Sequence, residues 1–211
     1  MANTNGSFGL RPIGMVGNER TTMGVSEYRI AHANASKLYN GMPVIPLASG
    51  MIDLAGGAEG GTVGILGSFD HCEYVSIISG KPVWSNYWPG SDANTGFPVR
   101  AFVHDHPLQT FVIASDASLT DEDTARAHVF ANFDFSTCIT GTDATGLSLG
   151  RLAVSTVATT NTLNMRLMGF VEDADNWDWT AAGVGCIVRL NNHFNSPNGA
   201  AAGGTVSNTG V

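Results

Sequence analysis

The stretch that most constrains this fold runs from residue 97 to 115, with the sequence FPVRAFVHDHPLQTFVIAS. Apolar residues alternate along both of its arms, which predicts two strands that each bury one face. Asp105, His106 and Pro107 lie between the arms and are typical of a tight turn. We expect a β-hairpin, and an isolated hairpin is marginally stable in water, so other strands must cover its apolar face. The expected core positions are Val99, Val103, Phe111 and Ile113.

The rest of the chain supplies further strand-like segments. Short β-branched or aromatic runs, separated by Gly, Pro and Asn, recur from about residue 25 to residue 194. One all-β domain can occupy a chain of 211 residues around a single core. We therefore expect a single β domain at 25–194, folded as a compact antiparallel barrel or jelly-roll-like sandwich. Residues 118–127 carry a capping residue, acidic residues and then helix formers, which predicts one short helix.

Both ends of the sequence lack the pattern of a folded element. Residues 1–24 are rich in Gly, Asn, Thr and Met, and residues 195–211 are rich in Gly, Ala, Ser and Asn. Neither segment has enough apolar residues to build a core of its own. We expect an extended N-terminal arm and a C-terminal tail, with a neighbouring subunit holding the ends in place.

The charge composition argues against one class of partner. The sequence has 10 Lys and Arg against 18 Asp and Glu, which gives a net charge of −8. Binding to nucleic acid requires clustered positive charge, and the sequence has no basic cluster. Only 13% of residues are charged, and the Gly, Thr, Asn and Ser that replace them suit neutral surfaces that contact other proteins. We expect protein partners and no nucleic acid.

The sequence also lacks the features of membrane and secreted proteins. No apolar run is long enough to span a bilayer, and the start has no charged segment followed by an apolar one. We expect a protein that is made in the cytoplasm and has no membrane partner. Cys72, Cys138 and Cys186 are odd in number and far apart, which predicts reduced, buried thiols in place of a zinc site or a disulfide framework.

One motif raises the hypothesis of an enzyme. Residues 146–150, Gly-Leu-Ser-Leu-Gly, match the nucleophile-elbow pattern, and Asp173 or Asp175 and then His193 follow in the order that hydrolases use. An elbow needs a strand before the serine and a helix after it, whereas a Thr/Gly loop precedes Ser148 and a strand-like run follows it. A small serine hydrolase that uses Ser148 is kept as a remote alternative, and we expect no catalytic residue.

Two groups of residues could contribute to a metal site. His104 and His106 would share one face of a continuing strand, but they supply only two ligands. The acidic loop Asp173–Asp178 lacks the glycine and the final glutamate of a calcium loop, since Val184 stands at the twelfth position. We expect a polar turn and a solvated loop, with no cofactor, and leave open a metal held at a subunit interface.

A dense aromatic cluster, VWSNYWP, occupies residues 83–89. Such a cluster can stack on a sugar or a base, but aromatic side chains packed over a sheet are more frequent. We therefore expect these residues to lie in the core or in a subunit interface.

The opening sequence, ANTNGSFGLRP at residues 2–12, resembles the ANxNGxFGLRP start shared by many small structural proteins of tailed bacteriophages. Those proteins are often placed as capsid cement or decoration proteins. Four further blocks extend the likeness in order along the chain: 64–69, 82–89, 101–107 and 187–193. The N-terminal motif is the most specific part, while the other blocks are ordinary sheet segments.

The resemblance implies a β-rich protein on the outer surface of the icosahedral head, where it would bind the major capsid protein and stabilise the shell. It also implies a homotrimer, a place in the virion and no catalysis. Four residues of the arm are expected to contact a partner chain: Phe8, Leu10, Arg11 and Pro12. A tail or fibre component of the virion is the alternative, because sheet-rich trimers of similar composition suit it equally well.

Overall fold

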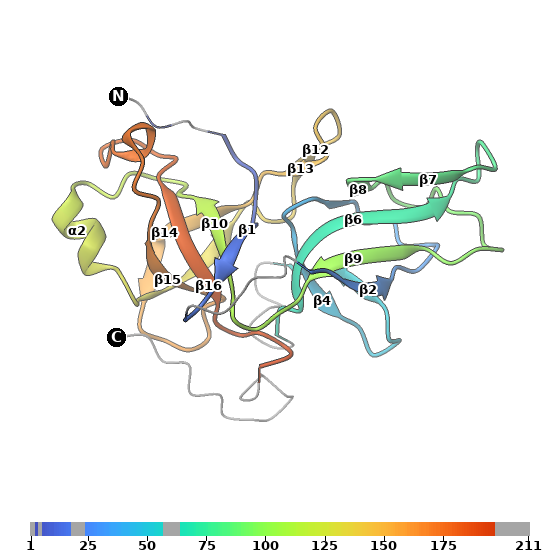
Figure 1. The fold of residues 1–211 in the computed structure, drawn as a ribbon, viewed down its shortest axis with the longest axis horizontal. Helices are drawn as coiled ribbons and strands as arrows, with labels where there is room; N and C mark the ends of the chain where they lie inside the picture. The colour runs from blue at the N-terminus through green and yellow to red at the C-terminus, as the bar shows by residue number, and fades with distance from the viewer. Residues whose placement is uncertain (1–2, 4–5, 18–23, 57–63, 197–211) are drawn as a thin grey trace.

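The computed structural model describes residues 3, 6–17, 24–56 and 64–196. Almost all of the regular structure in these residues is antiparallel β-sheet, with one short α-helix among them, which confirms the predicted all-β fold. Two six-stranded sheets lie end to end along the long axis of the molecule (Figure 1). We call them the first sheet, which contains β1, and the second sheet, which contains β2.

The first sheet has the strand order β1-β10-β16-β15-β11-β14. Its strands are β1 (Arg11–Met15), β10 (Gln109–Ala114), β11 (Asn132–Ser136), β14 (Arg151–Ala158), β15 (Met165–Phe170) and β16 (Gly185–Leu190). The sheet curls until β14 approaches the end of β10, where Ser115 forms a bridge with Leu152 and the N–H of Asp116 donates to the Leu152 carbonyl at 2.9 Å. The result is a partly closed barrel.

Helix α2 (Glu122–Ala127) lies at the end of the first sheet that points away from the second (Figure 1). The carboxylate of Asp121 accepts the N–H of Thr124 at 2.7 Å and so caps the helix. The helix therefore begins inside the predicted segment, and its buried Ala125 packs in the core. A single 3-10 turn, η1 (Ala174–Asn176), lies within the acidic loop before β16.

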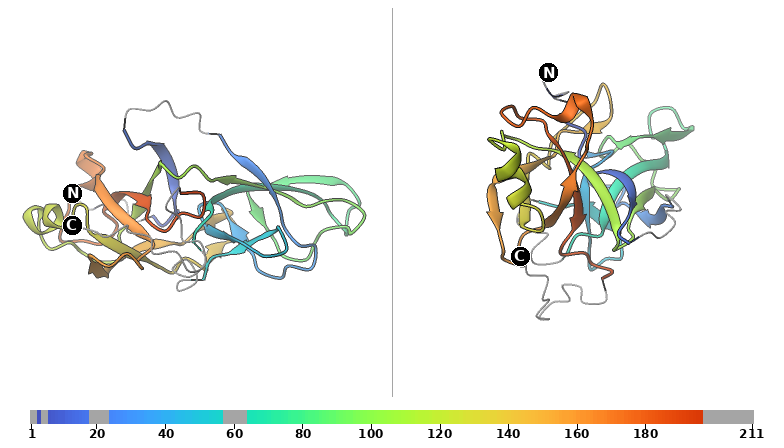
Figure 2. Two further views of the ribbon diagram at one scale, coloured as in Figure 1. Left: turned by 90° about the horizontal axis from the view of Figure 1, so that it is seen from below. Right: turned by 60° about the vertical axis from the view of Figure 1, so that its left-hand side comes forward.

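The second sheet has the order β2-β9-β6-β4-β5, and β7 also pairs with β6. Its strands are β2 (Ser26–Arg29), β4 (Pro43–Pro46), β5 (Ile52–Leu54), β6 (Gly67–Val75), β7 (Pro82–Ser85) and β9 (Arg100–His104). Two small ribbons accompany the sheets: β3 (Leu38–Tyr39) with β8 (Tyr87–Trp88), and β12 (Gly141–Thr142) with β13 (Leu147–Ser148). Figure 2 shows the second sheet extending away from the first as a twisted arm.

The buried apolar residues in the described ranges form two clusters, where the sequence predicted one core. Phe111 and Ile113 belong to the cluster of the first sheet, and Val99 and Val103 belong to that of the second. All four side chains are at most 1% exposed, so the predicted core positions are confirmed. Each sheet therefore has a buried cluster of its own.

The predicted hairpin at 97–115 is wrong. Strand β9 pairs with β2 and β6, whereas β10 pairs with β1 and β16. The turn between them carries the chain from the second sheet to the first. Alternation records which face of a strand is buried and does not record which strand lies beside it, so the two arms read alike whether or not they pair.

Part of the predicted N-terminal arm is folded on its own chain. Residues 11–15 form β1 and pair with β10, and Leu10 is 1% exposed in the first cluster. The N–H of Leu10 donates to the Gly41 carbonyl at 2.8 Å, and the Leu10 carbonyl accepts the Ser68 hydroxyl at 2.9 Å. Local composition missed this strand because its pairing depends on a partner distant in sequence. The predicted tail lies outside the described residues from 197 onward.

Candidate functional site

The second sheet has one buried face and one exposed face. Along β9, Ala101 and Val103 are fully buried, while Arg100 is exposed and Phe102 is half-buried. This alternation follows from the period of two in a strand. The outward-facing side chains of β2, β6, β7 and β9 form a continuous surface, which is the candidate functional site.

Three rings cluster on this surface. The imidazole of His71 stacks on Phe102, with ring centroids 4.3 Å apart and planes 12° apart. The Trp84 ring lies 5.3 Å from His71 and is 64% exposed. A large ring that is held in place by a neighbour and remains open to solvent is a common anchor in protein interfaces.

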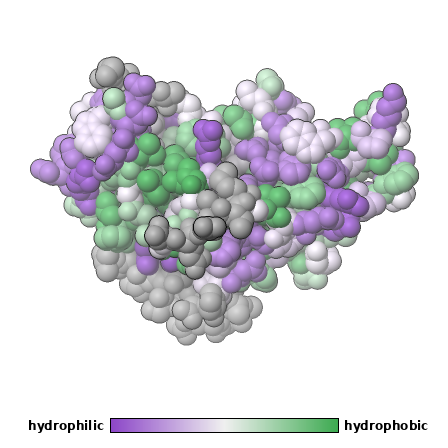
Figure 3. All heavy atoms as spheres, viewed as in Figure 1, coloured by the Kyte–Doolittle hydropathy of each residue, from purple (hydrophilic) through white to green (hydrophobic). Residues whose placement is uncertain are grey.

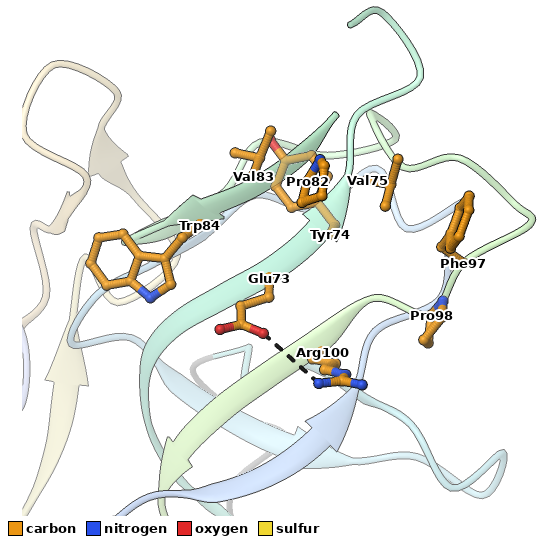
Figure 4. A pocket seen from close by; sticks show the side chains of 9 residues that line it. All are labelled: Glu73, Tyr74, Val75, Pro82, Val83, Trp84, Phe97, Pro98 and Arg100. Carbon is orange, nitrogen blue, oxygen red and sulfur yellow. Dashed lines mark ion pairs between the residues drawn. The ribbon is translucent and has the colours of Figure 1, made fainter. Parts of the chain in front are cut away.

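A hollow of about 440 Å³ borders one of these rings, Trp84 (Figure 4). Glu73 and Arg100 point toward one another across β6 and β9, and their charged groups are 4.0 Å apart. Trp84 lies at one end of the hollow, and Phe97, which is 53% exposed, lies at the other with Pro98. The hollow thus combines apolar ends with a charged pair between them.

Ion pairs extend this surface to the edge of the sheet. Glu27 on β2 pairs with Arg29 at 3.2 Å and with Arg100 at 3.7 Å. Exposed pairs of this kind add little stability, but they fix alternating charges in a row. Figure 3 shows hydrophobic and hydrophilic residues mixed along this part of the molecule. The surface can therefore offer apolar contacts and directional polar contacts together.

The structure separates the two histidines of the predicted metal pair. His104 is buried, and its Nε2 lies 3.6 Å from a carboxylate oxygen of Asp70, whereas His106 is exposed in the turn. Asp70 also contacts Nδ1 of His71 at 2.7 Å. The interaction with His104, followed by that with His71, outweighs burial and holds the pKa of Asp70 at about 2. The described residues contain no group of three or more His, Cys, Asp or Glu placed to bind a metal.

Sequence reasoning missed this Asp70 cluster. A β-bulge between Phe69 and His71 changes the register of β6 against β9, next to Asp70. The Asn40 amide donates to the Asp70 carbonyl at 2.7 Å, and the next residue, Gly41, accepts the N–H of Leu10. The cluster is therefore connected to the N-terminal segment. No local pattern in the sequence signals the bulge.

The acidic loop contacts the N-terminal segment. The Asn3 amide donates to the Asp178 carbonyl at 2.7 Å, and the Asn3 side-chain oxygen accepts the N–H of Asp178 at 3.0 Å. Phe8, Arg11, Asp173 and Asp175 contribute to a second hollow of about 300 Å³. Sequence reasoning flagged both segments but did not predict that they meet.

The four predicted partner-binding residues are not equally accessible. Leu10 belongs to the core of its own chain, and Phe8 and Pro12 are half-buried. Arg11 is the one of the four that is exposed. A role for Leu10 in contacting another chain would require this segment to leave its present position.

Ser148 is fully buried. Its hydroxyl oxygen accepts the N–H of Gly150 at 3.0 Å, and the described residues place no hydrogen bond between Ser148 and His193. A serine nucleophile needs a base within hydrogen-bond reach. This geometry therefore gives the hydrolase alternative no support.

The three cysteines are free and buried, as predicted. Burial raises the pKa of Cys72 and Cys186 to about 12 and that of Cys138 to about 11. Thiols with such pKa values are almost entirely protonated at neutral pH, and the thiol is a poor nucleophile.

In the part of the chain that the structure describes, no helix has the length and apolar character needed to cross a membrane. Comparisons with protein-family models, with curated proteins and with solved structures find no match to this chain. The geometry described above and the resemblance of the N-terminal motif are therefore the basis for a functional proposal.

Proposed function

We propose that this chain is a capsid cement protein of a tailed bacteriophage, which binds the major capsid protein on the outer surface of the head and stabilises the shell. The observation that carries the proposal is the exposed face of the second sheet, where Trp84 and Phe97 border a hollow of about 440 Å³. Exposed apolar residues that are gathered and rimmed by charge mark protein-binding surfaces. The N-terminal resemblance supplies the identity of the partner.

The second sheet is suited to this role by its position. It extends away from the first sheet (Figure 2), and its exposed face carries Trp84 and Phe97. The turn before β7 adds Ile77 and Ile78, which are 62% and 88% exposed. We further propose that the protein acts as a homotrimer, since repeated weak contacts add avidity on a symmetric lattice.

A binding assay with phage heads tests the proposal. The protein is mixed with heads that were assembled without it, and bound copies are counted after sedimentation. The double variant Trp84→Ala with Phe97→Ala should bind at least about tenfold more weakly, because exposed aromatic anchors carry much of the energy of an interface. Trp177→Ala is the control, since Trp177 is a 42% exposed tryptophan in the loop between β15 and β16, outside the second sheet, and its replacement should leave binding unchanged.

Three outcomes would contradict the proposal. Failure of the wild-type chain to bind heads would do so, and its recovery on tails by electron microscopy would favour the tail or fibre alternative. Equal binding by the double variant would show that another surface docks. Sedimentation equilibrium of the free protein at three times the 22.1 kDa chain mass would support the trimer.

A further inference from the structure

Arg189 on β16 has no partner among the residues that the structure describes. It is half-buried, and its Nε carries a buried N–H that no described residue accepts. Among the described residues, Arg189 makes no hydrogen bond or ion pair, and its cross-strand neighbours are Thr110 and Arg166. Removing a guanidinium from water without a counter-charge is unfavourable, so buried arginines are nearly always paired. Arg189 is therefore a cation placed for an anion that the described residues do not supply.

Two histidines near Arg189 also have N–H groups that can donate to an anion. The Nδ1 of His106 accepts the N–H of Leu108, and the Nδ1 of His193 accepts the N–H of Asn195, each at 3.1 Å. A ring nitrogen that accepts a hydrogen bond carries no proton, so the proton of each neutral ring lies on Nε2. The Nε2–H of His193 is buried and has no acceptor in the described part of the chain.

These three side chains line one hollow of about 170 Å³, where the turn between β9 and β10 meets the end of β16. That volume far exceeds the roughly 30 Å³ that a water molecule occupies in the liquid, so a small oxyanion fits. The neighbouring carboxylate, Asp105, is already engaged, since it accepts hydrogen bonds from the hydroxyls of Ser26 at 2.9 Å and Tyr28 at 2.6 Å. Arg166 adds positive charge to the neighbourhood of Arg189.

We propose that this hollow binds a small oxyanion, a phosphate or a carboxylate, through the guanidinium of Arg189 and the Nε2–H groups of His106 and His193. The two oxyanions share the chemistry that the site recognises, namely negative oxygens that accept charge-assisted hydrogen bonds. Burial lowers the pKa of His193 to about 4, so its ring is neutral at neutral pH and Arg189 supplies the charge. The site lies outside the exposed surface proposed to bind the capsid and does not depend on that function.

The test is a titration of the full chain followed by ¹⁵N NMR of the histidine ring nitrogens. Inorganic phosphate and sodium acetate are added in separate arms, with sodium chloride at matched ionic strength as the reference. The Nε2 resonances of His106 and His193 should shift saturably with at least one oxyanion and not with chloride. Saturation with phosphate alone identifies a phosphate site, and saturation with acetate identifies a site that takes carboxylates.

Matched variants assign the binding to these residues. Arg189→Gln should weaken binding by roughly tenfold or more, the loss of one charge-assisted hydrogen bond. Arg126→Gln removes the same charge from helix α2, outside both proposed sites, and should leave binding unchanged. His106→Gln changes an exposed turn residue and so keeps the test valid if Arg189→Gln does not fold; it should also weaken binding. Absence of saturation with both oxyanions, or unchanged binding when Arg189 or His106 is replaced, would overturn the proposal.

Discussion

The two sheets cover their apolar faces in different ways. Both have six strands and bury one apolar face, but the first sheet curls on itself and fills its interior with residues from outside its strands, such as Leu119, Ala125 and Trp179. The second sheet stays open, and its outer face carries exposed aromatic residues and ion pairs. Alternation along a strand predicts only that one face is buried, so it is compatible with a curled sheet and with an open one. In the first sheet, residues from the helix and the loops fill the interior.

The two sheets also differ in the surface that each can offer to a partner. The curled first sheet surrounds most of its buried cluster, whereas the open sheet has an exposed face that we propose binds another protein. The two are joined by backbone contacts around Gly41, whose N–H donates to Phe69 of the second sheet and whose carbonyl accepts from Leu10 of the N-terminal segment. Perturbing either core or this junction tests how independent the two sheets are.

The largest expected effects come from the two cores. Phe133→Ala in the first cluster and Phe69→Ala in the second should each lower the free energy of unfolding by about 3–5 kcal/mol, because each ring is fully buried. Urea unfolding is followed in variants that keep one buried tryptophan, Trp179 for the first sheet or Trp88 for the second. Each substitution should lower the midpoint of its own reporter more than that of the other.

Coincident midpoints for both reporters in both variants would contradict the idea that the two sheets have separate cores. They would mean that the two clusters unfold as one cooperative unit.

The junction should give the next largest effect. Gly41 has φ of +85°, and a Cβ there would overlap the Phe8 carbonyl oxygen, so Gly41→Ala should cost about 3 kcal/mol. Because this residue joins the sheets, both tryptophan reporters should lose stability equally. Gly50→Ala is the control, since Gly50 has φ of +77° with open space around it and should cost only about 1–2 kcal/mol. Equal costs for the two variants would show that the junction contact is unimportant.

A smaller effect is expected from acid. The pKa of Asp70 is about 2 in the folded chain and near 3.9 when unfolded, so its contribution to stability is present above about pH 4 and lost as the pH falls toward 2. Asp70→Asn should cost about 1 kcal/mol at neutral pH, a figure reduced for the partial exposure of the carboxylate. The gap from wild type should close at low pH in the Trp88 reporter. A gap that is independent of pH would contradict this assignment.

The smallest effect should come from the ion pairs of the open face. Arg100→Gln removes contacts with Glu27 and Glu73 but should cost less than about 1 kcal/mol, and less still at high salt. Thermal melts at low and high ionic strength measure this difference. A larger loss that salt does not reduce would mean that Arg100 stabilises the sheet by packing and not by charge.

The sequence predicts burial better than pairing. Val99 and Phe111 were placed correctly in a core because alternation reports directly on exposure. The pairing of β9 and β10 with other strands was missed because it depends on segments far away in the chain. The Asp70 cluster needs a bulge that changes the register next to it, and the unpaired Arg189 is visible only when every neighbour is known. Long-range register therefore limits what could be predicted of the site.

The strand order has a consequence for synthesis on the ribosome. All strands of the second sheet lie between residues 26 and 104, so this sheet is complete in the nascent chain before β10 emerges. Of the described strands, β1 is made first but must wait for β10, and β10 in turn lacks its inner neighbour until β16 is made. The first and the last of these strands thus flank β10, and the first sheet can close only after synthesis has passed residue 190.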